Sequence, residues 1–125
     1  MGAMGRAAPR RKVLFVEDEP SIRSTYERFF ASHYEMAFAT SGSEALRRLQ
    51  SFDPDVLVLD MRLPDTDGVA LLQDIRTSRP ALPVIITTAY VSMEPLVDVL
   101  QLGHSGYLVK PFDMDDLAAR IDAVG

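Results

Sequence analysis

The sequence predicts an α/β domain in which five parallel strands form one sheet with helices on both faces. From Lys12 onward, short apolar runs typical of strands alternate with amphipathic runs typical of helices. A helix between successive strands requires a right-handed crossover, which makes neighbouring strands parallel. The 125 residues are the size of one domain, and neither an internal repeat nor a linker divides them. We therefore expect a single domain over residues 12–125.

Residues 1–11 precede the first periodic run and contain arginines but no acid. They lack any hydrophobic periodicity, so we expect a disordered, solvated tail. The second methionine, Met4, is consistent with either an unstructured native end or a remnant of cloning.

The predicted strands are short apolar runs bounded by polar or turn-forming residues. In chain order they are Val13–Val16, Tyr34–Ala39, Asp55–Leu59, Pro83–Thr87 and Gly106–Val109. The third contains four consecutive aliphatic residues, Val56–Leu59, as expected of a parallel strand that is buried on both faces.

The predicted helices carry apolar residues at helical spacing or signals of a helix start. They are Pro20–Ala31, Ser43–Leu49, Gly68–Arg76, Ser92–Leu102 and Asp113–Ala123. The inward sets in the first three are Ile22, Tyr26, Phe29 and Phe30; Ala45, Leu46 and Leu49; and Val69, Leu72 and Ile75. Pro95 suits the first turn of the fourth helix, and acids in the first turn of the fifth suit the helix dipole.

Composition excludes several classes of function. The net charge of −5 argues against nucleic-acid binding by this domain. The absence of cysteine excludes disulfides, thiolate metal sites and a cysteine nucleophile, and it is consistent with a cytoplasmic location. No apolar run has the length of a membrane span, and the N-terminus lacks the apolar core of a signal peptide.

Chemically active residues follow four of the predicted strands. Asp60 ends the third strand, the acids Glu17–Glu19 follow the first, Thr88 follows the fourth and Lys110 follows the fifth. The carboxyl ends of parallel strands form the edge of the sheet where ligands bind. Acids gathered there repel one another, and a bound hard cation such as Mg²⁺, which prefers oxygen ligands, would explain the clustering.

Each of these residues also has an ordinary structural interpretation. Glu19 suits a helix N-terminus, and Thr87 suits a strand. Lys110 followed by Pro111 is typical of a surface lysine at a strand end, although a cis bond there could direct the lysine inward. Tyr107 is more often a core aromatic than a moving part, and it cannot share a strand face with Lys110. We assign no chemical role to the two isolated histidines or to the turn at Asp67-Gly68.

Taken together, these residues resemble the receiver domain of bacterial two-component response regulators. The resemblance covers residues 12–124 and rests on the following segments: Val16–Pro20, Asp60 with Leu63-Pro64 and Asp67-Gly68, Thr88-Ala89, and Gly106–Phe112. It implies a flavodoxin-like (CheY-like), doubly wound sheet of order 2-1-3-4-5. It also implies a signalling module rather than a conventional enzyme.

The resemblance implies a role for each site residue. Asp60 would take a phosphoryl group from a histidine kinase or a phosphotransfer protein. Mg²⁺ would be held by Asp18, Asp60 and the backbone carbonyl of Arg62, with Glu17 acting through a bound water. Lys110 and Thr88 would contact the phosphoryl group, and Tyr107 would swing inward behind Thr88.

The resemblance also implies an output surface and shows two departures from the family pattern. The helix Ser92–Leu102, the strand Gly106–Val109 and the helix Asp113–Ala123 would present a changed surface to an output domain or partner protein. The acid that often precedes the tyrosine is replaced by Gly106, which puts one known dimer mode in doubt. In the family, the residues two positions beyond the phosphoacceptor and beyond the threonine modulate hydrolysis of the aspartyl phosphate. In this chain those positions hold the bulky side chains Arg62 and Tyr90.

Three other functions are less well supported by the sequence. A phosphatase of the haloacid dehalogenase type needs a second acid two residues after its nucleophile, where this chain has Arg62. A flavin-binding domain needs a phosphate-cradling loop after the first strand, where Glu17–Glu19 would repel phosphate. A receiver-like domain that only binds partners would not need the intact set of Asp60, Thr88 and Lys110.

Overall fold

The structure is a computed structural model, and it describes residues 10–89 and 106–124. Residues 1–9 of the predicted tail, Tyr90 and the predicted helix Ser92–Leu102 lie outside the described residues.

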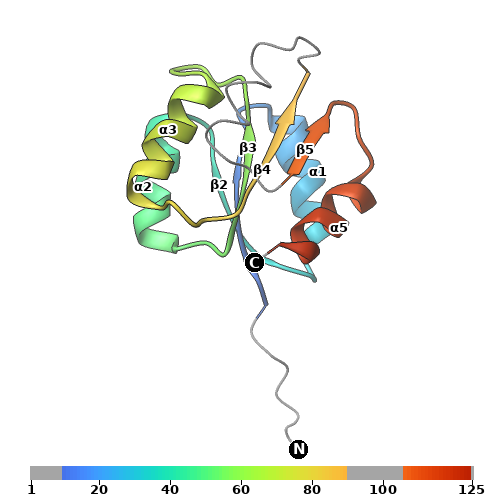
Figure 1. Cartoon of the computed structure of the whole chain (residues 1–125). Helices are drawn as coiled ribbons and strands as arrows, with labels where there is room; N and C mark the ends of the chain where they lie inside the picture. Colours follow the sequence, from blue (N-terminus) through green and yellow to red (C-terminus); the bar gives the residue numbers. More distant parts are fainter. Residues whose placement is uncertain (1–9, 90–105, 125) are drawn as a thin grey trace, which may run out of the picture.

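A five-stranded parallel sheet forms the centre of the domain (Figure 1). Its strands are β1 (Lys12–Val16), β2 (Glu35–Ala39), β3 (Val56–Asp60), β4 (Val84–Thr88) and β5 (Gly106–Val109). The strand order is β2-β1-β3-β4-β5, and every neighbouring pair is parallel. The predicted fold class and strand order are therefore confirmed. Because β1, β3 and β4 are interior strands, their apolar residues are buried on both faces.

The described helices form two layers on the sheet (Figure 1). They are α1 (Pro20–Phe30), α2 (Gly42–Phe52), α3 (Gly68–Ser78) and α5 (Met114–Ala123). Helices α2 and α3 cover one face through Leu49, Leu72 and Ile75, whereas α1 and α5 cover the other. The two cores follow from the period of two along each strand, which sends alternate apolar side chains to opposite faces.

The core on the α1/α5 face is built around aromatic rings. The ring of Phe15 on β1 lies 4.7 Å from that of Tyr26 and 5.7 Å from that of Phe30, measured between centroids. The prediction that Phe29 faces inward with them is wrong, because 40% of it is exposed. Tyr26 and Phe30 are four residues apart and share the buried side of α1, whereas Phe29 is rotated away from the sheet and its ring meets the Phe30 ring edge-on.

Side-chain caps and tertiary packing set the helix ends. Ser41 accepts a hydrogen bond from the Glu44 amide at 3.2 Å, and Asp67 accepts one from the Ala70 amide at 2.8 Å. The predicted turn at Asp67-Gly68 is thus the N-cap of α3. Helix α2 continues to Phe52, beyond its predicted end at Leu49, because Phe52 packs on the α2/α3 core.

Candidate functional site

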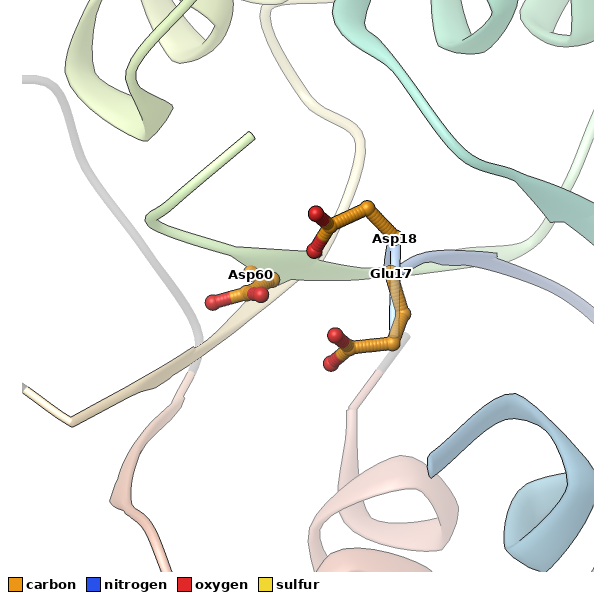
Figure 2. Close-up of side chains that lie close together, drawn as sticks. All are labelled: Glu17, Asp18 and Asp60. Carbon is orange, nitrogen blue, oxygen red and sulfur yellow. The ribbon is translucent and has the colours of Figure 1, made fainter. Parts of the chain in front are cut away.

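Three carboxylates meet at the carboxyl edge of the sheet. Glu17 and Asp18 directly follow β1, and Asp60 is the last residue of β3, the strand beside it. Figure 2 shows the three side chains pointing to the same side of the backbone, and one oxygen from each lies within 4.8 Å of the other two. Glu17 and Asp60 are buried, whereas Asp18 is exposed. The predicted clustering of these acids is therefore confirmed.

Lys110 brings a positive charge into this cluster from the end of β5. Its Nζ lies 3.0 Å from Glu17 Oε1 and 3.4 Å from Asp60 Oδ2, so one ammonium group serves two carboxylates. The Lys110–Pro111 peptide bond is cis, as the sequence allowed. With three acids facing one lysine, the cluster keeps an excess of negative charge that a cation can neutralise.

Burial and mutual charge shift the pKa values of this pair. Burial raises the pKa of Glu17 to about 7; the hydrogen bond from Lys110 opposes that rise, and the charge of Asp60 adds to it. Burial alone would lower the pKa of Lys110, but its bonds and charge interactions with Glu17 and Asp60 outweigh burial and raise it. Lys110 therefore stays charged at neutral pH.

The loop after β3 is closed on itself beside Asp60. The Met61 carbonyl accepts a bond from the Gly68 amide at 2.8 Å, and Arg62 and Asp67 form an isolated antiparallel bridge. The Arg62 amide lies 3.3 Å from Asp60 Oδ1. The turn therefore keeps the Arg62 backbone next to the acid cluster, where the sequence resemblance places a carbonyl ligand.

Asp65 fixes the far end of this loop, and the sequence interpretation missed it. Its two carboxylate oxygens accept bonds from the Gly42 amide at 2.8 Å and the Ser43 amide at 3.1 Å. These bonds lower the pKa of Asp65, and they cap the start of α2 from a different segment of the chain. The partners are 23 residues apart in sequence, so local spacing gives no signal for the contact.

The two residues predicted to switch conformation lie on adjacent strands, β4 and β5. Thr88 ends β4 and is fully buried, and its carbonyl accepts a bond from the Lys110 amide at 2.7 Å. Tyr107 on β5 is half-buried and packs against the α2/α3 core. Lys110 reaches the acids on the other face, so the prediction that Tyr107 and Lys110 face opposite sides is confirmed.

An open cleft of about 390 Å³ lies over the acids. Its lining residues are Asp18, Glu19, Asp60, Arg62, Leu63, Pro64, Ala89 and Lys110. The cleft has room for a hydrated cation together with a phosphoryl-sized group, since a water molecule occupies only about 30 Å³. Asp60 is thus reachable from solvent although little of it is exposed.

Comparison with known proteins identifies the family. The family model described as the response regulator receiver domain matches residues 13–122. The chain belongs to this family. It is therefore a receiver domain of a two-component response regulator, a signalling module rather than a conventional enzyme.

Two curated relatives and two solved structures illustrate the similarity. The chain is 41% identical over 111 residues to the DNA-binding transcriptional regulator NtrC of Escherichia coli, covering 88% of this chain and 24% of the relative. It is 36% identical over 107 residues to the regulatory protein AtoC of the same species, covering 85% and 23%. The chemotaxis protein CheY4 of Vibrio cholerae superposes with a TM-score of 0.85 at 29% identity, covering 93% and 99%. The Francisella response regulator 1452 receiver domain gives 0.83 at 33% identity, covering 90% and 94%.

The receiver domain spans about a quarter of the length of these two curated relatives. Within residues 10–89 and 106–124, no helix is long and apolar enough to cross a bilayer.

Proposed function

We propose that Asp60 is the phosphoacceptor of this receiver domain and that it takes its phosphoryl group from a histidine kinase or a phosphotransfer protein. The observation that carries this proposal is the placement of Asp60 in the cleft, next to the Lys110 ammonium and to the other two acids. Glu17 is a poorer candidate, because it does not line the cleft.

The transfer is a displacement at phosphorus. An Asp60 carboxylate oxygen attacks the phosphorus of a phosphohistidine, the P–N bond breaks, and the imidazole leaves with the bonding electrons and takes up a proton. The product is an aspartyl phosphate. Two anions must approach each other in this step, so fixed positive charge beside them lowers the barrier. Lys110 supplies such a charge from within 3.4 Å of Asp60.

The donor set fits Mg²⁺. Mg²⁺ prefers oxygen ligands and retains several waters, which suits an open cleft with carboxylates on one side. Asp18, Asp60 and the Arg62 carbonyl would hold the ion, with Glu17 acting through a water. When bound, the ion neutralises charge on the phosphoryl oxygens.

The same site supports a switch. We infer that the phosphoryl group draws the Thr88 hydroxyl and Lys110, and that Tyr107 then moves inward behind Thr88. This change would alter the surface formed by β5 and α5, where an output domain or partner protein would bind. NtrC is a DNA-binding transcriptional regulator, so transcriptional output is the first choice to test.

Mass spectrometry after incubation with acetyl phosphate tests this function. Wild type with Mg²⁺ should gain the mass of one phosphoryl group, and it should gain none when EDTA removes the metal. Asp60→Asn should gain none under either condition. Asp65→Asn is the matched control, since Asp65 is in the same loop but outside the cleft, and it should be phosphorylated like wild type. Uptake by Asp60→Asn at the wild-type rate would refute the assignment, and no uptake by wild type would favour a receiver that only binds partners.

A further inference from the structure

Two buried hydroxyl groups near the acid cluster make no hydrogen bond of ordinary geometry among the described residues, although they lie close enough to each other for the Thr87 hydroxyl to lower the pKa of Tyr26. They belong to Tyr26 on α1 and Thr87 on β4, each only 1% exposed. Buried hydroxyls are nearly always hydrogen-bonded, since an unsatisfied one loses its bonds to water without replacement. Such a pair next to a reactive site therefore calls for a functional explanation.

Sheet register places both hydroxyls on the face of the sheet where Glu17 and Lys110 are paired. Thr87 is the register partner of Asp60, so the two side chains leave the sheet on the same face. Tyr26 packs on that face against Phe15, and Glu17 follows Phe15 by two residues. Burial raises the pKa of Tyr26, the negative charges of Glu17 and Asp60 raise it further, and the Thr87 hydroxyl opposes them. The Tyr26 hydroxyl is thus a neutral donor close to the acids.

Glu17 needs a second donor if the domain works as proposed. Its Oε2 accepts a bond from the Glu19 amide at 3.2 Å, but among the described residues its Oε1 is paired only with Lys110. When Lys110 turns to a phosphoryl group on Asp60, Glu17 Oε1 loses its cation while the side chain stays buried. A buried carboxylate that loses its cation is destabilised, so a protein donor at Oε1, in addition to the metal-bound water that Glu17 would contact, would favour the phosphorylated state.

We propose that the Tyr26 hydroxyl takes the place of Lys110 at Glu17 when Asp60 is phosphorylated, with the Thr87 hydroxyl orienting it. Tyr26 Oη donates its proton to Glu17 Oε1, and Thr87 Oγ1 donates to Tyr26 Oη. This inference rests on the proposed function, because it requires Lys110 to move toward a phosphoryl group. Tyr26 is then a positioning residue that stabilises the active state without touching the phosphoryl group.

Binding of beryllofluoride, which forms a phosphoryl-like adduct with an aspartate, tests the proposal. Its affinity in excess Mg²⁺ is measured by calorimetry for wild type and Tyr26→Phe, and the stability of each free protein is measured by urea unfolding. Tyr26→Phe should bind beryllofluoride roughly tenfold to a hundredfold more weakly, the range for a hydrogen bond to a charged group. Its stability without ligand should equal or exceed that of wild type, since the hydroxyl that is removed makes no hydrogen bond of ordinary geometry among the described residues.

Two further variants separate this role from a general packing effect. Tyr34→Phe removes a hydroxyl from the same face of the sheet, but that hydroxyl donates to Asp122 at 2.7 Å. It should lower the stability of the free protein and leave beryllofluoride affinity unchanged. In a Glu17→Gln background, Tyr26→Phe should weaken beryllofluoride binding far less than in wild type, because the charged acceptor is gone.

The outcomes distinguish this inference from the proposed function. If wild type binds beryllofluoride and Tyr26→Phe binds it equally well, the donor exchange is wrong and the proposed function stands. If Tyr26→Phe weakens binding equally in the Glu17→Gln background, the hydroxyl acts on something other than Glu17, which also overturns the inference. If wild type fails to bind beryllofluoride, the proposed function fails and this inference falls with it.

Discussion

Replacing Asp60 with asparagine should stabilise the metal-free protein. With one oxygen of each acid within 4.8 Å of the others, an effective dielectric constant of about 20 gives a repulsion of ~3.5 kcal/mol for each pair. The substitution removes two such repulsions, and it also removes the attraction to Lys110 at 3.4 Å, worth ~5 kcal/mol on the same scale. The two repulsions less the attraction leave about 2 kcal/mol, and because Asp18 is exposed and water screens its repulsion, we expect a net gain of less than about 2 kcal/mol.

Urea unfolding with EDTA and with excess Mg²⁺ measures this gain. In EDTA, Asp60→Asn should be more stable than wild type in urea unfolding, and its melting temperature in a thermal scan should be higher by up to roughly 10 °C. Mg²⁺ should stabilise wild type more than the variant, because the ion relieves the same repulsion and loses one ligand in the variant. The difference between the two proteins should therefore shrink or reverse when metal is added.

Asp74→Asn is the control for loss of a negative charge elsewhere, since Asp74 is exposed on α3. It should change stability little and should not alter the response to Mg²⁺. If Asp60→Asn is less stable than wild type in EDTA, the attraction to Lys110 outweighs the repulsion among the acids. The account of the site as a cluster strained by excess negative charge would then be wrong.

Three further predictions concern the same region. Because the pKa of Glu17 lies near 7 in the folded protein against 4.5 for the ordinary side chain, the folded state binds more protons between these values. Glu17 therefore contributes stability below pH 4.5 that is lost as the pH rises to 7. The free energy of unfolding in urea should fall less between pH 5 and pH 7.5 in Glu17→Gln than in wild type. Gly68→Ala should destabilise by roughly 1–3 kcal/mol, because its Cβ would lie 2.7 Å from the Met61 Cα, a backbone atom that cannot move aside. Gly42→Ala, whose Cβ would clash with a side-chain methyl of Thr66 and would lie at ordinary contact distance from the Asp65 carboxylate, should cost less, and the reverse order in thermal melts would contradict this reasoning. Arg62 lines the cleft, so Arg62→Ala should speed loss of the phosphoryl group in a decay assay, whereas equal or slower decay would show that this side chain does not shield it.

The sequence by itself determined the strands, the parallel sheet and the edge at which its chemistry lies. Alternating apolar runs give the positions of β1 and β3, and a strand that ends in Asp60 places that acid at the carboxyl edge of the sheet. Strand-end residues are predictable because parallel strands bring their carboxyl ends together regardless of how the helices pack. The grouping of Glu17, Asp18 and Asp60 followed from this rule alone.

Only the tertiary structure decided which contacts join segments that are distant in the chain. Asp65 caps α2 from 23 residues away, and Lys110 is shared between Glu17 and Asp60, because the loops and the sheet register bring these groups within bonding distance. Phe29 and Tyr26 have similar sequence signals, yet packing against the sheet buries only Tyr26 and leaves its hydroxyl beneath the acids. Helical and strand periods assign a side chain to a face of its own element, but the partner that it meets there depends on how the layers are stacked.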